Sequence, residues 1–347
     1  MSTIYDEIER LKKDLENDQD QKLKIALFGQ PGAGKSSLIN KIVGRKVANT
    51  GQGTDITVDA QIIEHNDLIL VDLPGYGTSK FAPNRWFEKF EPEQYDLFLC
   101  VFSGKFHESD STFFKQLKSK DRVCLFVRNK HDDIWEDGKE IAELEEEITQ
   151  DVQKQVGTPE QVFFVSCRRD YGLDRLMDGI RQSLEPAKRD KYVRSAKAYT
   201  LEHIEKKRAS CESMVYKYAG LAAANGLNPI PGVNIGVDIS VMMKLFTEIR
   251  TVYGLTDDRI KSLAPTLMPL SKKIIDFASK EGVILLLKRY ADKEIVKQIG
   301  RYIPFVGQAI AAVAGFGMTL SAGKSYLEDC HTLAEKILEE ELSVSSR

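Results

Sequence analysis

Hydrophobic and polar positions alternate in blocks along the first half of the chain. Short, continuous apolar runs are separated by longer segments in which apolar residues recur every three or four positions. A continuous run is typical of a strand buried on both faces, and the wider spacing is typical of a helix that packs on a sheet. The runs predict strands near residues 23–28, 58–64, 67–72, 96–102, 122–127 and 161–165. The spaced segments predict helices near residues 35–43, 84–91, 110–119, 139–155 and 172–184.

This alternation predicts an α/β domain over residues 21–187. Strands that alternate with helices form a mostly parallel sheet with helices on both faces. The loops after parallel strands meet at one edge of such a sheet, which is where ligands bind. We therefore expect the chemistry of this domain to lie in the loops that follow its strands.

The second half of the chain carries a helical pattern only. No strand pattern recurs after about residue 187, so residues 188–347 predict an all-α domain. Its first segment, residues 188–208, is predicted to be a connecting helix. Residues 1–20 predict a further amphipathic helix, whose apolar stripe needs a surface to pack on because an isolated helix of this length is marginal.

A glycine-rich loop lies between the first predicted strand and the first predicted helix, where residues 29–36 read GQPGAGKS. The pattern G-x-x-x-x-G-K-[ST] in this context predicts a loop whose backbone amides bind phosphate, aided by the positive end of the helix. Lys35 would contact the β- and γ-phosphates, and Ser36 would bind Mg²⁺. The candidate phosphate-binding residues are Gly29, Gly32, Ala33, Gly34, Lys35, Ser36 and Ser37.

A second motif, D-x-x-G, ends the apolar run at residues 68–73. Asp72 is predicted to hold the Mg²⁺ ion, and Gly75 lets a backbone N–H approach the γ-phosphate. One threonine between the two motifs should also reach the ion. We favour Thr57 because a strand pattern begins just after it, with Thr54 as the alternative.

The fifth predicted strand is followed by the pattern N-K-x-D at residues 129–132. The Asp132 carboxylate can accept the two N–H groups on one edge of guanine, which adenine lacks, so this motif predicts GTP rather than ATP. Asn129 is expected to tie the base-binding loop to the phosphate loop, and the stem of Lys130 to lie on the base. The loop after the last predicted strand adds three candidate base-binding residues, Ser166, Cys167 and Arg168.

Composition adds few constraints. The 347 residues carry a net charge of −3, so no overall field favours nucleic acid as a partner. The five cysteines are scattered and lack a C-x-x-C pair, which fits a reducing, cytoplasmic compartment. No secretory signal is recognised at the start, and Ser2 in place of glycine excludes N-myristoylation if this start is native.

Beyond these motifs, the chain resembles the immunity-related GTPases, the p47-type interferon-inducible members of the TRAFAC class of P-loop GTPases. The resemblance spans nearly the whole chain. It is carried by DLPGYGT at 72–78, FAP at 81–83, YDLF at 95–98, FVR at 126–128, PIPGV at 229–233 and IPFVG at 303–307. It implies a Ras-like GTPase domain joined to a helical domain built from both ends of the chain, on which residues 1–20 would pack.

The resemblance also implies self-assembly regulated by GTP on membranes, often on vacuoles that hold intracellular pathogens. Similar sequences occur outside vertebrates, so a role in innate immunity does not follow from the resemblance alone. The chain is shorter than the vertebrate effectors and lacks their acylation site. It has Asn129 where many members carry threonine, which leaves the expected preference for guanine intact.

Hydrolysis by a single molecule is expected to be slow. Small GTPases often carry glutamine after D-x-x-G to orient the attacking water, whereas this chain has Tyr76. We expect a second copy to dock nucleotide face to nucleotide face and supply the missing help. Asp55 is the candidate residue for that interface, since family members often have an acidic residue there, although it can equally be a solvated loop residue. The candidate catalytic residues are Lys35, Asp55, Thr57 and Gly75.

Two helical segments raise the question of membrane contact. Residues 303–322 are about long enough to cross a bilayer, but polar residues and glycines dilute them, so we favour a buried core helix. Residues 281–301 join an apolar run to basic residues and fit either an interfacial helix or a core helix with a solvated edge.

Three functions remain in competition. The first is a GTPase that binds Mg²⁺, cycles and self-assembles, and the second is a GTP-dependent binding module with negligible hydrolysis. A GTPase for ribosome assembly is disfavoured because the chain lacks a basic RNA-binding segment.

Overall fold

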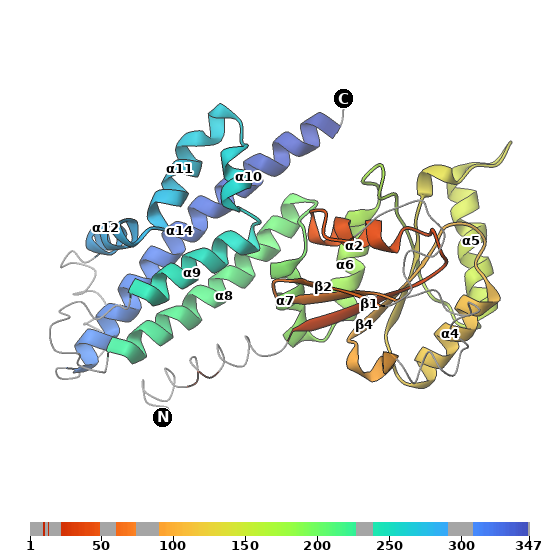
Figure 1. Cartoon of the computed structure of the whole chain (residues 1–347), viewed down its shortest axis with the longest axis horizontal. Coiled ribbons are helices and arrows are strands. Elements are labelled where there is room, and N and C mark those ends of the chain that lie inside the picture. Colours follow the sequence, from red (N-terminus) through yellow and green to blue (C-terminus); the bar gives the residue numbers. More distant parts are fainter. Residues whose placement is uncertain are drawn as a thin grey trace. The chain divides into compact units, whose positions relative to one another are not determined.

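The computed structural model describes residues 10, 13, 22–48, 60–73, 90–226, 239–290 and 308–345 (Figure 1). The chain divides into two compact units, of which one is Lys22–Tyr199 and the other contains the residues from Thr200 onward. This boundary lies later than the one expected after residue 187. The helices expected over residues 1–20 and near 84–91 lie almost entirely outside the described residues, as do the turn segments 229–233 and 303–307.

The first unit is built on a six-stranded sheet, which confirms the predicted mostly parallel architecture. The strand order is β2-β3-β1-β4-β5-β6, and only the pairing of β2 with β3 is antiparallel. Each strand begins and ends close to the bounds that its apolar run predicts. The strands are β1 (Leu23–Gly29), β2 (Gln61–His65), β3 (Leu68–Asp72), β4 (Leu97–Phe102), β5 (Cys124–Arg128) and β6 (Val162–Phe164).

Helices cover both faces of this sheet because successive side chains of each strand point to opposite faces. In β1, Ile25 and Leu27 join a core shared with one group of helices, whereas Ala26 and Phe28 join the core on the other face. The first core is covered by α2 (Lys35–Val43), α6 (Leu173–Ser183) and α7 (Pro186–Ser195). The second is covered by α4 (Glu108–Ser119) and α5 (Ile141–Val156).

The connecting helix expected over residues 188–208 is interrupted, so that prediction was wrong. Helix α7 ends at Ser195, and the backbone of Ala196 is extended. The next residues bond to the end of α2, since the Lys197 amide donates to the Ile42 carbonyl at 2.8 Å and the Tyr199 hydroxyl to the Lys41 carbonyl at 2.6 Å. Helix α8 then begins anew, with Thr200 Oγ1 accepting the His203 amide at 3.1 Å.

The second unit is helical throughout its described residues, in agreement with the predicted all-α domain. Helices α8 and α14 are its longest described elements, and close packing between them leaves no room for a side chain at Gly323. A Cβ there would lie 2.7 Å from Val215 Cγ1 of α8. Its elements are α8 (Leu201–Gly226), α9 (Ile239–Val252), α10 (Asp257–Lys261), α11 (Met268–Phe277), α12 (Lys280–Tyr290) and α14 (Gln308–Ser345).

Aromatic side chains fill the centre of this helical unit. The rings of Phe246 on α9 and Tyr326 on α14 are stacked with centroids 3.9 Å apart. Tyr218 of α8 is fully buried and donates its hydroxyl hydrogen bond to Glu248 at 2.5 Å. None of the described helices combines the length and hydropathy that a bilayer crossing needs.

Candidate functional site

The loops that carry the predicted motifs follow β1, β3, β5 and β6 and meet at one edge of the sheet. This follows from the parallel pairing, which brings the carboxyl ends of these strands side by side. Gly29 ends β1, Asp72 ends β3, and Asn129 follows β5 directly. The structure therefore brings together the described candidate residues of the phosphate and base loops.

The phosphate loop depends on glycines in conformations that other residues rarely adopt. Gly29, Gly32 and Gly34 have φ angles of 127°, 73° and 91°. A Cβ on Gly29 would lie 2.0 Å from the Val101 carbonyl oxygen. The first helical hydrogen bond of α2 is donated by the Leu38 amide to the Gly34 carbonyl, so the preceding amides, including that of Ser37, point out of the helix end.

The Lys35 side chain folds back onto this loop. Its side chain is buried, and Nζ donates to the carbonyl oxygens of Gly29 and Gln30 at 3.2 and 3.3 Å. Burial lowers the pKa of Lys35, while the nearby carboxylates of Asp72 and Asp110 oppose that shift. An additional anion at the loop would raise the pKa of this ammonium.

Ser36 and Asp72 form a donor set that fits a magnesium ion. Ser36 Oγ donates to Asp72 Oδ2 at 2.5 Å, and Asp72 is 1% exposed. The other oxygen, Asp72 Oδ1, is buried and has no hydrogen-bond partner among the described residues. Burial raises the pKa of Asp72 above its ordinary value, partly offset by Lys35 and by the Ser36 hydrogen bond. A hydroxyl and an orphaned carboxylate oxygen are ligands that Mg²⁺ takes in proteins.

The Asn129 side chain joins three parts of the site. Its Nδ2 donates to the Ala33 carbonyl in the phosphate loop at 2.8 Å, and its Oδ1 accepts the Cys167 amide at 3.3 Å. Its own backbone amide donates to the Phe102 carbonyl at the end of β4. The residue is 2% exposed, so water does not compete for these bonds.

The base loop places the Asp132 carboxylate against the loop that follows β6. Ser166 Oγ donates to Asp132 Oδ1, and this bond holds the pKa of Asp132 below its ordinary value. The Arg168 guanidinium lies 4.0 Å from Asp132 Oδ2 and is exposed. Lys130 is exposed and has a left-handed backbone with φ 57°.

Residues outside the predicted set hold the base loop in place. The ring of His131 stacks on that of Tyr171 with centroids 4.1 Å apart, and its Nε2 lies 2.7 Å from Glu145 Oε1 on α5. The Ser166 and Tyr171 backbones pair with each other. The stack of His131 on Tyr171 joins residues 40 positions apart, and no motif spacing predicts it.

A buried acid beside the phosphate loop also escaped sequence reasoning. Gln30 Nε2 donates to the Lys105 carbonyl at 2.8 Å and to Asp110 Oδ2 at 3.2 Å, which fixes the loop to the first turn of α4. Asp110 is buried, and burial raises its pKa. The sequence signal that could have identified Asp110 is an acidic residue in the first turn of a helix that follows a buried strand.

Several candidate residues lie outside the described part of the chain. This holds for both possible switch threonines, Thr54 and Thr57, and for Asp55, Gly75 and Tyr76. Their roles stay as predicted from the sequence.

The two inner glycines of the phosphate loop offer a matched test of this geometry. A Cβ on Gly34 would lie 2.3 Å from Asn129 Nδ2, whereas a Cβ on Gly32 would meet nothing within 4 Å. We expect Gly32→Ala to cost about 1–2 kcal/mol of stability through its left-handed backbone alone. Gly34→Ala should cost about 1–3 kcal/mol more, because the Asn129 hydrogen bonds are also lost. Urea unfolding of both variants checks this, and equal losses would contradict it.

Comparison with known proteins identifies relatives of this chain. Interferon-inducible GTPase 1 of Mus musculus is 28% identical over 266 residues, which are 70% of this chain and 63% of the mouse protein. The T-cell-specific guanine nucleotide triphosphate-binding protein 2 of Mus musculus is 25% identical over 346 residues, 92% of this chain and 81% of that protein. This chain thus spans less than two thirds of the length of the first of these relatives.

One solved structure shows how limited the structural likeness is. The crystal structure of Era from Aquifex aeolicus bound to GDP.AlF4- covers 61% of this chain and 69% of its own, with 20% identity and a TM-score of 0.39. A TM-score this low supports no conclusion about the present chain. The interferon-inducible GTPase (IIGP) family, in contrast, matches residues 2–340. The chain therefore belongs to the interferon-inducible GTPase family.

Proposed function

We propose that this chain binds GTP with Mg²⁺, hydrolyses it slowly as a single molecule, and hydrolyses it faster when two molecules dock through their nucleotide faces at a membrane. The observation that carries the proposal is the Asn129 side chain, which bonds to the phosphate loop at Ala33 and to the loop after β6 at Cys167. A phosphate site and a base site joined by one side chain suit a nucleotide that spans both.

The phosphate end of the site has the chemistry that a triphosphate needs. The left-handed glycines open the loop so that backbone amides converge, and the N-terminus of α2 adds positive potential. Lys35 is the nearby cation, and its ammonium can exchange the carbonyls of Gly29 and Gln30 for phosphate oxygens. Charge neutralised in this way is the main contribution that such sites make to phosphoryl transfer.

Ser36 and Asp72 would hold Mg²⁺ in this site. The ion supplies positive charge to the phosphate oxygens when bound. The proposal is supported by the 2.5 Å contact between the two side chains and by the second Asp72 oxygen, which has no partner among the described residues. By sequence, Thr57 or Thr54 would complete the ligands, although neither is a described residue.

The base end of the site favours guanine. The low pKa of Asp132 keeps its carboxylate charged, and a charged carboxylate accepts hydrogen bonds only. Guanine offers two donors on one edge, from N1 and from the amino group on C2. In the 166–168 loop, the Ser166 and Cys167 amides donate to Tyr171 and Asn129, so the Arg168 amide is the proposed donor to the O6 atom of the base.

The substitution Asp132→Asn tests whether the Asp132 carboxylate recognises guanine. The amide keeps one acceptor and adds a donor, so it suits xanthine, which carries a carbonyl in place of the amino group of guanine. We expect the affinity for GTP to fall by about 100-fold or more and that for xanthosine triphosphate to rise, measured by fluorescent nucleotide displacement. The neighbouring carboxylate offers a matched control, because Asp133→Asn should leave both affinities unchanged. Unaltered preference in Asp132→Asn would refute the assignment.

Hydrolysis by a single molecule is proposed to be slow, because Tyr76 takes the position where small GTPases often carry glutamine. Its phenol cannot orient water as a side-chain amide does. We propose that a second copy supplies the missing help, with Asp55 at the interface. Two observations support this arrangement. The chain belongs to the interferon-inducible GTPase family, and its motif loops lie together at one edge of the sheet.

Turnover per molecule should therefore rise with protein concentration. Charge stabilisation supplied in trans is worth roughly 10³–10⁵ in rate in known GTPases, so the increase should be large before it levels off. Phosphate release measured over a wide range of protein concentrations checks this. A constant rate per molecule would rule out the dimer, and negligible release at every concentration would favour the GTP-dependent binding module.

Membrane action is proposed from the family resemblance and has one local point of support. In α12, Val283, Leu286 and Leu287 are buried in the helical unit, but Leu285 is 62% exposed. One exposed leucine at the edge of a core helix gives a small apolar contact for a lipid surface.

Vesicle flotation tests the membrane proposal. With phosphatidylserine-containing vesicles, we expect more protein to float with GTP than with GDP, and Leu285→Asp to reduce flotation. Leu342→Asp is the matched control, because Leu342 is 49% exposed on a different helix, α14. Absence of flotation with either nucleotide would remove the membrane from the proposal.

A further inference from the structure

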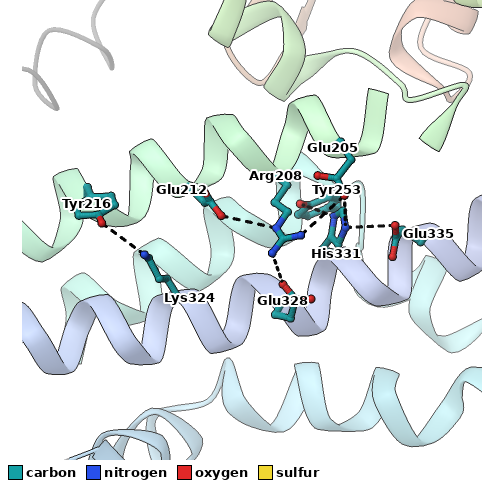
Figure 2. A network of polar contacts seen from close by, with 9 residues as sticks. All are labelled: Glu205, Arg208, Glu212, Tyr216, Tyr253, Lys324, Glu328, His331 and Glu335. Atoms are coloured by element: carbon teal, nitrogen blue, oxygen red, sulfur yellow. Dashed lines mark hydrogen bonds and ion pairs between the residues drawn. The ribbon is translucent and has the colours of Figure 1, made fainter. Parts of the chain in front are cut away.

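The contact between α8 and α14 contains a buried histidine that faces two carboxylates (Figure 2). His331 of α14 is 3% exposed, and its Nε2 lies 3.2 Å from Glu205 Oε1 of α8 and 3.4 Å from Glu335 Oε1, one turn further along α14. We propose that Glu205, His331 and Glu335 bind a divalent transition-metal ion of the Zn²⁺ type. All three residues belong to the helical unit.

The spacing of the three ligand atoms suits such an ion. They all lie within 4.8 Å of one another. Zn²⁺ holds nitrogen and oxygen ligands at about 2.0–2.2 Å in a tetrahedron, which places neighbouring ligand atoms about 3.3–3.5 Å apart. The two distances from His331 Nε2 agree with that edge length, whereas a direct N–H···O hydrogen bond is nearer 2.9 Å. One ring proton also serves two acceptors poorly, while one cation serves both.

The other side of the imidazole ring is arranged to support a metal ligand. Nδ1 of His331 lies 3.4 Å from the Tyr253 hydroxyl. When Nε2 binds a metal, the ring carries its proton on Nδ1, and histidine ligands almost always donate that proton to a polar partner. The phenol oxygen of Tyr253 is an acceptor for this bond.

The acidic side chains around the histidine outnumber the basic ones, which favours the binding of a dication. The network in Figure 2 contains four carboxylates, from Glu205, Glu212, Glu328 and Glu335, and two cations, Arg208 and Lys324. Arg208 is closest to Glu328 at 3.0 Å and lies 3.9 Å from Glu205, so its charge is shared among several acids. The side chains of Glu205 and Glu335 are 55% and 35% exposed, which gives an ion access from solvent.

The ligand types select the class of metal. An imidazole with two carboxylates suits Zn²⁺ and its neighbours in the first transition row, whereas Mg²⁺ prefers oxygen ligands alone. The spacing of His331 and Glu335, four residues apart on one helix face, matches that of the paired ligands in helical zinc motifs. The third ligand comes from a different helix, so the bound ion would cross-link α8 to α14.

A metal titration of the full chain tests the site. Protein freed of metal with a chelator is saturated with Mg²⁺ and GDP, which keeps the nucleotide loops out of the measurement. We expect isothermal titration with ZnCl₂ to show one ion per chain and a raised melting temperature. Co²⁺ should give the visible absorption of a tetrahedral ion without a thiolate charge-transfer band. Such a band would assign the ion to a cysteine and overturn the proposal.

Matched variants separate the site from general metal binding. Glu205→Gln and Glu335→Gln preserve the size of the side chain and leave the buried His331 unchanged, so both variants should fold. Each should weaken Zn²⁺ binding by about tenfold or more. Glu212→Gln is the control, because Glu212 is also on α8 and also faces Arg208 but lies outside the three ligands. If the wild type binds no ion, or if both ligand variants bind like the control, the three residues form only a hydrogen-bonded cluster.

Discussion

The nucleotide site is held together by the amide of Asn129. Both ends of this side chain are used, because Nδ2 donates to Ala33 and Oδ1 accepts from Cys167. A rotation that improved one bond would break the other, so the side chain has one stable orientation. Each bond contributes about 1 kcal/mol, but the cost of leaving either partner unpaired in this buried place is larger. The phosphate loop and the base loops thus keep a fixed separation.

That fixed separation depends in turn on the parallel sheet. Its strands deliver the motif loops to one edge, and two separate cores fix the strands from both faces. The helical unit is stabilised differently. Its centre combines the aromatic stack of Phe246 and Tyr326 with buried polar groups, including the histidine between α8 and α14. One unit is therefore organised by strand order and the other by side-chain packing between long helices.

The sequence was sufficient for the features that depend on local pattern. The six apolar runs became strands, and β1, β3 and β4 are largely buried on both faces. The edge strand β2 has one exposed face, on which Ile62 is 65% exposed. The glycine-rich loop followed from the strand and helix around it. The described motif residues also lie at one sheet edge, as the alternation predicts. Contacts between distant residues could not be predicted in this way.

The interruption between α7 and α8 illustrates the reason. Residues 188–208 look helical by themselves, but Lys197 and Tyr199 bond to carbonyls of α2, far away in the sequence. The Gln30–Asp110 bond and the setting of His331 are of the same kind. Tertiary contacts of this sort can be predicted only once the fold is known, since no spacing along the chain encodes them.

Helix α2 lies between two functional parts of the sheet unit. Its first residues belong to the phosphate loop, and its last turn holds the segment through which the chain leaves the sheet unit. A helix of this length behaves as a stiff rod about 13 Å long. Any tilt of the rod at the glycine end must therefore be taken up at Lys197–Tyr199, just before Thr200 starts α8. The position of the phosphate loop and the path by which the chain leaves the sheet unit are therefore coupled through this one helix.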